Sequence, residues 1–362
     1  MKRIGIIGAG QLGQMLGQAG RALELEFVFL DPSPEPPAAT VGRVQRRAFD
    51  DVAALEQLAA ATDVVTYEFE NVPVGAIESI ASDTCVYPPP EALRFAQDRL
   101  SEKRLFEALH IPVAPYRAVD SERDLRAAAA EIGLPVVLKT RRLGYDGKGQ
   151  AIIRDGSDLA GSVAALGGGN LIAEQLIAFD REVSAIGVRN VRGDVAVYPL
   201  IENQHRDGIL DCSRAPLAMP RLAEVASRHL RQMLSHLEYV GVLTIEFFDV
   251  GGSLLANEYA PRVHNSGHWT IEGARTSQFE NHLRAILDLP LGEVAPVGHS
   301  AMLNLIGSMP PNSIELDPEM AWLHDYGKSP RAGRKLGHIT IVADNAAGRE
   351  REIARVRERL IP

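Results

Sequence analysis

The sequence has few cysteines, no long basic segment and no long apolar segment, and each absence excludes a class of protein. Its two cysteines, Cys85 and Cys212, lie far apart without metal-ligand spacing, which excludes a disulfide framework and a zinc ribbon. The formal net charge of −9 argues against a nucleic-acid partner, because that affinity depends on clustered lysine and arginine. No run approaches the roughly 18 apolar residues of a membrane span, so we expect no membrane partner.

Length and the amino-terminal residues set further expectations. The segment MKRIGIIGAG runs from a basic pair directly into a strand-like stretch, and we expect no signal peptide there. A cytoplasmic protein is therefore the default expectation. With 362 residues, 46% of them hydrophobic, the chain is long enough for two or three domains with substantial cores.

The amino-terminal segment has the pattern of an α/β unit. A strand, RIGIIG, is followed by the glycines Gly8-x-Gly10-x-x-Gly13 and by helical spacing of apolar residues over 11–23. A second strand ends at Asp31, about where a dinucleotide-binding domain keeps its ribose-binding carboxylate. Taken alone, these features favour NAD.

The third strand changes that interpretation. The segment DVVTYEFENV ends in Glu68 and Glu70, at the edge where doubly wound sheets bind ligands, and such acceptors suit an amine or hydroxyl donor. A solvated loop is the alternative. The prolines of residues 86–90 then predict a stiff connector that excludes helix, and one helix is expected over residues 91–110.

The middle of the chain contains a glycine loop between two predicted strands. The first strand delivers Lys139, and the loop contains Gly144, Gly147, Lys148 and Gly149. A glycine loop between antiparallel strands can close over phosphates with its backbone N–H groups, although an ordinary glycine hairpin would explain the glycines alone. It is not a P-loop, because that signature leads into a helix.

A strand ending at residues 174–177 precedes another that begins at Glu182. The backbone at such a turn can pair with an adenine edge, and a following carboxylate can accept from ribose hydroxyls. By itself this spacing is a weak signal.

The segment GVLTIEFFDVGGSLLANEYAPR indicates a hairpin that turns at Gly251 and Gly252. If the hairpin is centred near residue 252, Glu246 lies directly opposite Glu258, where like charges repel. Oxygen ligands from these glutamates, and from Asn257 as a further candidate, suit Mg²⁺ shared with nucleotide phosphates. Solvent-facing glutamates are the alternative, which the apolar neighbours on both strands disfavour.

A cluster of donors follows the hairpin. The loop before a helix predicted to start near Thr276 contains cationic and neutral donors that suit bicarbonate, a carboxylate or a phosphate: Arg262, His264, Asn265, Ser266 and His268. A single loop histidine is more often structural than catalytic, but five polar donors within seven residues indicate an anion site.

The order of these motifs along the chain resembles the ATP-grasp superfamily. The motifs are a strand that carries a lysine, a glycine-rich flap, a Glu-x-x-Ile hinge and a hairpin with the pattern Glu…Asn-Glu. The segments GQLG, YEFENV, GYDGKGQ, ENQHRDGIL, NEYAPRVHNSGHWTIEGARTSQFENHLRAIL and GRKLGHIT resemble motifs of the N5-carboxyaminoimidazole ribonucleotide synthetase family along the whole chain. The resemblance implies a fold of the α/β and α+β classes: a Rossmann-like preATP-grasp domain (1–95), an ATP-grasp domain (96–295, with a flap subdomain at about 115–178) and a small carboxyl-terminal closing domain (296–362).

The resemblance also implies roles for matching residues. The ATP contacts are Arg99, Lys139, Gly144, Tyr145, Asp146, Gly147, Lys148, Gly149, Gln150, Glu174, Gln175, Leu176, Ile177, Glu182, His205, Asn257 and Glu258. Mg²⁺ would bind Glu246 and Glu258. The contacts to aminoimidazole ribonucleotide are Gln11, Leu12, Glu70, Arg262, His264, Asn265, Ser266, Lys328, Arg334 and Lys335. The catalytic set is Asp146, Tyr145, Arg262, His264 and Lys328.

In this family the amino-terminal glycine loop helps to bind the ribonucleotide, so no NAD is expected. The implied reaction consumes ATP and bicarbonate and passes through carboxyphosphate, with Asp146 on the flap handling the amine proton. The family implies a homodimer. Three rivals remain at this stage: a formate-dependent glycinamide ribonucleotide formyltransferase, an NAD-dependent oxidoreductase and a non-catalytic nucleotide sensor.

Overall fold

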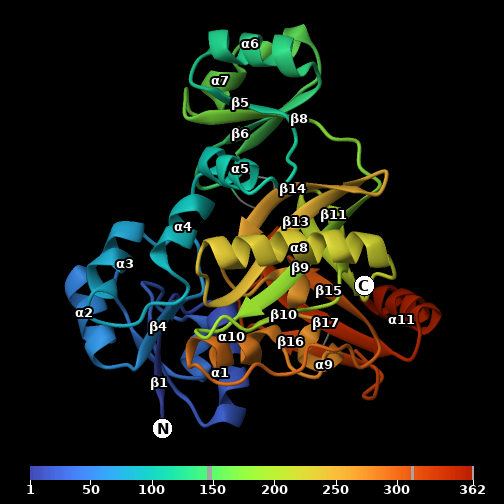
Figure 1. Ribbon diagram of the computed structural model, residues 1–362. Helices are drawn as coiled ribbons and strands as arrows, with labels where there is room; N and C mark the ends of the chain where they lie inside the picture. Colours follow the sequence, from blue (N-terminus) through green and yellow to red (C-terminus); the bar gives the residue numbers. More distant parts are fainter. Residues whose placement is uncertain (145–148, 311–313, 361–362) are drawn as a thin grey trace.

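The computed structural model describes residues 1–144, 149–310 and 314–360, whose strands form three sheets (Figure 1). Tyr145, Asp146, Gly147 and Lys148, which belong to the predicted flap, lie outside the described residues. The three sheets correspond to an amino-terminal unit, a small flap subdomain and a central sheet that extends into the carboxyl-terminal segment.

The amino-terminal sheet is parallel, with the order β3-β2-β1-β4. Its strands are β1 (Arg3–Ile7), β2 (Glu26–Leu30), β3 (Arg43–Gln45) and β4 (Val64–Tyr67). Its helices are α1 (Gln11–Gly20), α2 (Val52–Ala60) and α3 (Val74–Ala81). The predicted strand-turn-helix start is confirmed, except that residues 21–23 form a 3₁₀ turn instead of continuing α1.

The single helix expected over residues 91–110 is wrong, because two helices, α4 (Pro90–Ala96) and α5 (Arg99–Ala108), occupy the segment. The first helix ends at its C-cap Gln97, and the Asp98 carboxylate starts the second by accepting from the amides of Leu100 and Ser101, as an N-cap does. Pro90 is also helical rather than part of the connector, since proline is tolerated at the first helical position.

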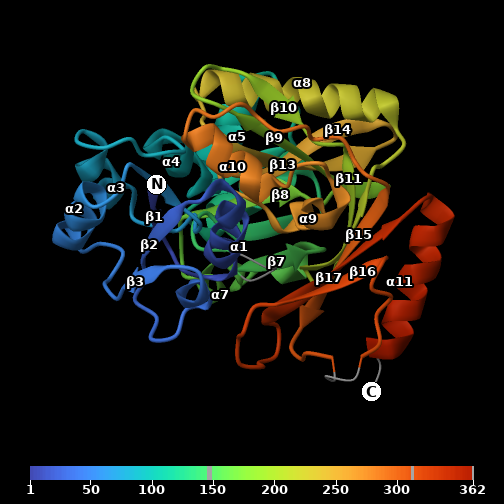
Figure 2. The ribbon, with the colours of Figure 1, turned by 90° about the horizontal axis from the view of Figure 1, so that it is seen from below.

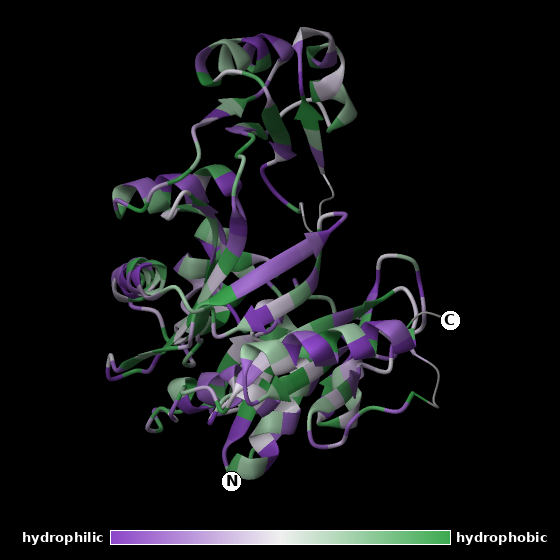
Figure 3. Cartoon of the chain, turned by 90° about the vertical axis from the view of Figure 1, so that its right-hand side faces the viewer, coloured by the Kyte–Doolittle hydropathy of each residue, from purple (hydrophilic) through white to green (hydrophobic). Residues whose placement is uncertain are grey.

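The flap subdomain is an antiparallel sheet in the order β5-β8-β6-β7, covered on one side by α6 and α7. Its elements are β5 (Tyr116–Val119), α6 (Glu122–Ile132), β6 (Val136–Thr140), β7 (Gln150–Ile153), α7 (Ser162–Ala165) and β8 (Leu171–Gln175). Figure 3 shows the subdomain standing out from the rest of the chain on narrow connections. The antiparallel pair β6–β7 confirms the predicted strands on both sides of the glycine loop.

The central sheet has the order β14-β13-β9-β11-β12-β15-β17-β16, with β10 also pairing with β9. Its strands before the carboxyl-terminal segment are β9 (Arg181–Arg189), β10 (Val195–Val197), β11 (Ile201–Arg206), β12 (Ile209–Ala215), β13 (Gly241–Val250) and β14 (Ser253–Ala260). Alternation along β9 divides the core: Ala185 packs with α8 (Pro220–His236), whereas Ile186 packs with α10 (Gln278–Ile286). The same cluster joins Leu12 of α1 to Leu283 of α10, which attaches the amino-terminal unit to the central sheet.

The carboxyl-terminal segment does not form a separate sheet. Its strands β15 (His299–Ile306), β17 (Lys335–Ala343) and β16 (Ala321–Asp325) continue the central sheet from β12. Helix α11 (Ala346–Leu360) packs against β15 and β17, as Figure 2 shows, and the short α9 (Thr270–Gly273) also contacts β17. Among the residues described, no helix combines the length and apolar character needed to cross a membrane.

Candidate active site

The glycine turn at the start of α1 is held by side chains of the protein itself. Gly10 and Gly13 donate their N–H groups to the two oxygens of Glu68, at 2.7 and 3.1 Å, and Ala9 donates to Asp31 at 2.9 Å. Asp31 and Glu68 are therefore turned inward, and neither is presented to a dinucleotide. The NAD alternative loses the groups on which it depended.

The predicted ribonucleotide contacts come from three parts of the chain and lie together. Glu70, just after β4, pairs with Arg262, just after β14, at 2.6 Å. Lys328, which follows β16, donates to the Gln11 side chain at the start of α1, and its ammonium group lies 5.7 Å from the centre of the Tyr326 ring. Burial, followed by the charge of Arg334, lowers the pKa of Lys328 to about 8.

His264 connects this cluster to the predicted metal site. Its Nε2 lies 3.0 Å from Glu246 Oε1, and its Nδ1 lies 2.8 Å from Ser266 Oγ. Gln278 of α10 fixes the His264 backbone on both sides, accepting from its N–H at 2.9 Å and donating to its carbonyl at 2.6 Å. The imidazole is thereby aimed across the loop at β13.

Glu246 and Glu258 face one another in the β13–β14 ladder, as the hairpin predicts. The register shifts between Glu246 and Phe247, which pairs with Ala256, so Asn257 is the extra residue of a β-bulge. Without the bulge Glu246 would face Asn257. The bulge therefore determines that Glu246 faces Glu258, and no feature of the sequence predicted the bulge.

The two glutamates and Asn257 fit a hard cation bound together with nucleotide phosphates. Asn257 Oδ1 is buried without a hydrogen-bond partner, and the carboxylates of Glu246 and Glu258 are held by His264 and Arg99. Burial disfavours the ionised form of Glu258, but the Arg99 guanidinium at 2.7 Å outweighs it and holds the pKa of Glu258 well below its usual range. Within the described ranges no group of three or more His, Cys, Asp or Glu side chains is arranged to hold a metal ion by itself, so phosphate and water would have to complete the shell of a Mg²⁺ ion.

The predicted ATP residues lie on the flap subdomain and on the facing strands. Lys139 of β6 pairs with Glu174 of β8 at 3.2 Å. The Glu182 carboxylate of β9 accepts from Nδ1 of His205 of β11 at 2.6 Å. The segment 176–180 connects β8 to β9, and the Leu176 amide donates to Pro135 O.

At the base of the glycine loop, Arg99 donates to Gly144 O at 3.3 Å. Gly149 has φ of 71°, where a Cβ would approach Thr140 Oγ1 to 2.7 Å, so glycine is required.

The structure also places most of the other predicted substrate contacts. Leu12 and Ser266 are buried, and Asn265 Nδ2 is buried without a hydrogen-bond partner. Arg334 donates to Ser329 O, and Lys335 is the first residue of β17. Of the basic segment, the structure places Lys328 directly against another predicted substrate contact, Gln11.

Glu102, Lys103 and Gln278 were not predicted from the sequence, and no role at the glycine turn was predicted for Glu68. Glu102 and Lys103 have 2% and 1% of their surface exposed, although they stand in a charged segment, SEKR, that is typical of a solvated helix. Their i, i+3 and i+4 spacing from Arg99 was the available signal, because it places all three on one helix face.

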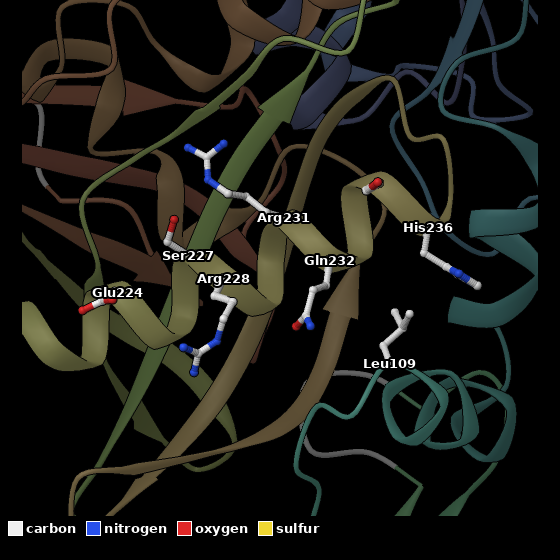
Figure 4. A pocket seen from close by; sticks show the side chains of 8 residues that line it. Leu109, Glu224, Ser227, Arg228, Arg231, Gln232 and His236 are labelled. Atoms are coloured by element: carbon white, nitrogen blue, oxygen red, sulfur yellow. The ribbon is translucent and has the colours of Figure 1, made fainter.

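A groove on the surface lies elsewhere. It has a volume of about 670 Å³, runs along the outer face of α8 beside the end of α5, and is lined by Arg228, Arg231, Gln232 and His236 among others (Figure 4). The predicted site residues that the structure describes are absent from its lining.

Comparison with protein-family models matches three successive segments. Residues 1–97 match the ribonucleotide synthetase preATP-grasp domain, residues 104–279 the ATP-grasp domain, and residues 300–352 the phosphoribosylaminoimidazole carboxylase C-terminal domain. The order agrees with the fold class predicted from the sequence.

Similar proteins cover the chain from end to end. A curated N5-carboxyaminoimidazole ribonucleotide synthase from Pseudomonas aeruginosa is 49% identical over 354 residues, 98% of each chain. The crystal structure of the synthetase from Thermus thermophilus has a TM-score of 0.95 and 51% identity, covering 99% of both chains. A structure from Aspergillus clavatus, in complex with ADP and 5-aminoimidazole ribonucleotide, has a TM-score of 0.91 and 30% identity, covering 99% of this chain and 98% of that one.

Proposed function

The chain belongs to the N5-carboxyaminoimidazole ribonucleotide synthase family, and from that premise we propose how its own residues share the reaction. It is an ATP-grasp ligase that carboxylates 5-aminoimidazole ribonucleotide (AIR) to N5-carboxyaminoimidazole ribonucleotide with ATP, in purine biosynthesis. The family uses ATP with Mg²⁺. What remains to be assigned is the role of each side chain.

Nucleotide binding falls to the flap subdomain and to β9, β11 and β14. Lys139 offers its ammonium to the phosphates, and the N–H groups of the glycine loop supplement it. The backbone of residues 174–177 pairs with adenine through groups other than the Leu176 amide, which donates to Pro135 O, while Glu182, held by His205, accepts from the ribose hydroxyls. The Lys139–Glu174 and Glu182–His205 contacts support this arrangement.

Glu246, Glu258 and the Asn257 side chain would hold Mg²⁺, and the bound ion would supply positive charge that offsets the charge of the nucleotide phosphates. The unpartnered Asn257 Oδ1 beside two opposed carboxylates supports the assignment.

AIR binds where the amino-terminal unit, the loop after β14 and the segment after β16 come together. Lys328 takes the phosphate together with Arg334 or Lys335, and Gln11, Leu12 and Glu70 contact the sugar and the base. Arg262 and His264 face the carboxyl group that is transferred. The observation that carries the proposal is the 3.0 Å contact between His264 and Glu246, because it brings the predicted AIR loop against the predicted metal carboxylates.

The chemistry proceeds in two steps. A bicarbonate oxygen attacks the γ-phosphorus of ATP, the bond to the β-phosphate oxygen breaks, and carboxyphosphate and ADP form. The exocyclic amine of AIR then bonds to the carboxyl carbon, directly or after release of CO₂ in the closed site, and inorganic phosphate leaves. Asp146 accepts the amine proton, with Tyr145 or His264 assisting, and closure of the flap excludes water from the intermediate.

We further propose a cytoplasmic homodimer, as the family resemblance implies. Light scattering on the purified protein should give twice the mass of the chain. A single-chain mass at micromolar concentration would contradict the dimer without affecting the reaction.

The first experiment is an ADP-release assay in bicarbonate-depleted buffer. Turnover should require AIR and Mg·ATP together and should rise as bicarbonate is added. A requirement for formate and glycinamide ribonucleotide instead would indicate the formyltransferase, and ATP binding without turnover in either mixture would indicate a sensor.

A further inference from the structure

Helix α5 surrounds Glu258 with three side chains from one helix face. Arg99 Nη1 donates to the Glu258 carboxylate at 2.7 Å. Residues three and four positions further on, Glu102 and Lys103, reach the backbone on either side of the same glutamate. Side chains with this spacing lie next to one another on a helix.

The two backbone contacts bracket Glu258. Lys103 Nζ donates to Asn257 O at 2.7 Å, and Glu102 Oε1 accepts from the Tyr259 amide at 2.7 Å. Both peptide units adjoining Glu258 are thus fixed from α5. The backbone of Glu258 is then held in place, and its carboxylate can move only by rotation about the side-chain dihedral angles.

The Lys103 contact falls on the β-bulge. Asn257 is the residue passed over in the β13–β14 register, so it has no opposite residue in the described ladder. A bulge of this kind lets two consecutive residues face one residue of the neighbouring strand, here Asn257 and Glu258 facing Glu246. Lys103 donates to the carbonyl of the passed-over residue.

The same ammonium group extends the contact to the flap subdomain. Lys103 lies 3.2 Å from Glu174 Oε2, and the other oxygen of Glu174 lies 3.2 Å from Lys139. An ammonium group has three donors, and those of Lys103 are directed at Glu174, Asn257 O and Ala256 O, the last at 3.3 Å. A lysine with 1% of its surface exposed is costly to bury, which argues against an incidental contact.

We propose that Lys103 and Glu102 are positioning residues that hold the metal-binding bulge and, through Glu174, the phosphate-binding lysine in register across the hinge. The inference rests on the proposed nucleotide and metal site. It adds two residues that act through the backbone of Glu258 and the carboxylate of Glu174.

The test measures binding of ADP by calorimetry as Mg²⁺ is varied, because binding does not depend on carboxylation. Lys103→Met keeps the apolar stem and removes the ammonium group. We expect ADP affinity at saturating Mg²⁺ to fall by about tenfold or more, as expected for a lost charge-assisted contact at the site, and half-saturation by Mg²⁺ to move to higher concentration. KM for AIR should stay within about twofold of the wild-type value, because the substitution leaves the predicted AIR contacts, among them Gln11 and Lys328, unchanged.

A matched pair at Glu102 separates positioning from bulk stability. Glu102→Gln keeps an oxygen that can accept from Tyr259 N–H and should bind ADP nearly as the wild type does. Glu102→Leu removes that acceptor and should raise the Mg²⁺ requirement, meaning the Mg²⁺ concentration at which ADP binding is half-saturated. Leu105→Ala, on the same helix and 4% exposed, lowers thermal stability and should leave the Mg²⁺ requirement unchanged.

If Lys103→Met does not fold, its combination with Glu174→Gln removes both buried charges and is compared with Glu174→Gln alone. The double variant should still need more Mg²⁺, since the bulge carbonyl has lost its donor. Equal Mg²⁺ requirements in that comparison, or in Lys103→Met and the wild type, would overturn the inference. Failure of the wild type to bind Mg·ADP would instead overturn the proposed nucleotide site.

Discussion

The amide of Gly10 donates to Glu68 Oε1 at 2.7 Å, so the first turn of the glycine-rich helix already holds an anion that belongs to the protein. In dinucleotide-binding domains the same N–H groups hold a pyrophosphate. A Cβ at Gly10 would lie 2.8 Å from Glu68 Oε1, so a larger residue there would displace the carboxylate from this position. The motif therefore reports the close approach of an anion and leaves open whether that anion is a ligand or a side chain.

Replacement of Glu68 by glutamine tests this relationship. The variant turns an NH₂ group toward one of the two amides, and we expect a loss of about 1–3 kcal/mol in the free energy of unfolding. KM for AIR should rise, because Gln11 and Leu12 begin the same turn, while KM for ATP should stay within about twofold. Denaturant titration and steady-state kinetics measure the two effects.

The control for that substitution is Glu26→Gln, in an exposed ion pair with Arg3. It should change stability by less than about 0.5 kcal/mol. A Glu68→Gln protein as stable as this control would show that the carboxylate does not hold the turn. Neither variant should bind NADH, so the fluorescence of NADH should not change when either protein is added.

Local rules predicted much of the fold from the sequence. The glycines of the first turn, the strands beside Lys139 and the hairpin at Gly251 and Gly252 each depend on neighbouring residues, and each lies where it was expected. The division of residues 91–110 into two helices was missed, because Asp98 looks like an ordinary surface residue until its cap contacts are known.

The candidate site was predicted through paired residue types rather than through contacts. The opposition of Glu246 and Glu258 was correct, yet the bulge on which it depends has no signature in the sequence. Lys103 could not be found in the same way, because its partners Glu174 and Asn257 lie 71 and 154 positions away in the chain. Burial of a charged residue is a property of tertiary packing, which a short motif does not encode.

Replacement of Glu258 by glutamine should weaken nucleotide and metal binding together. The carboxylate is a predicted ligand of Mg²⁺ and also the partner of Arg99, so its loss removes one charge from each contact. We expect the dissociation constant of Mg·ADP to rise by about tenfold or more, equivalent to about 1.4 kcal/mol, by calorimetry.

Glu131→Gln, in the exposed pair with Arg117 on the flap subdomain, is the matched control and should bind Mg·ADP as the wild type does. Unchanged Mg·ADP affinity in Glu258→Gln would refute the metal assignment.

Asp146 lies in the loop that is predicted to contact ATP through its backbone N–H groups, and its carboxyl group is predicted to act in proton transfer. Asp146→Asn should retain Mg·ADP affinity and lose carbamate formation by a factor of about 10²–10⁴, the usual contribution of a general base. Single-turnover assays of AIR consumption measure the loss. An unchanged rate would remove Asp146 from the mechanism, and the Tyr145 hydroxyl and His264 would become the candidates.

The pH dependence of kcat/KM for AIR should show whether the charge of Lys328 takes part in binding AIR. Burial and the neighbouring Arg334 lower the pKa of its ammonium group to about 8, so the group is charged below that pH and neutral above it. If it binds the phosphate of AIR, kcat/KM for AIR should fall as pH rises through about 8, approaching a tenfold decrease per pH unit, because kcat/KM reports the free enzyme. Lys328→Arg remains charged throughout this range and should lack the decrease, even if its overall efficiency is lower. The profile of kcat/KM for ATP, measured on both proteins, is the internal control, since Lys328 contacts Gln11 of the AIR cluster. A decrease near pH 8 that persists in Lys328→Arg would assign it to another group and leave the phosphate contact to Arg334 or Lys335.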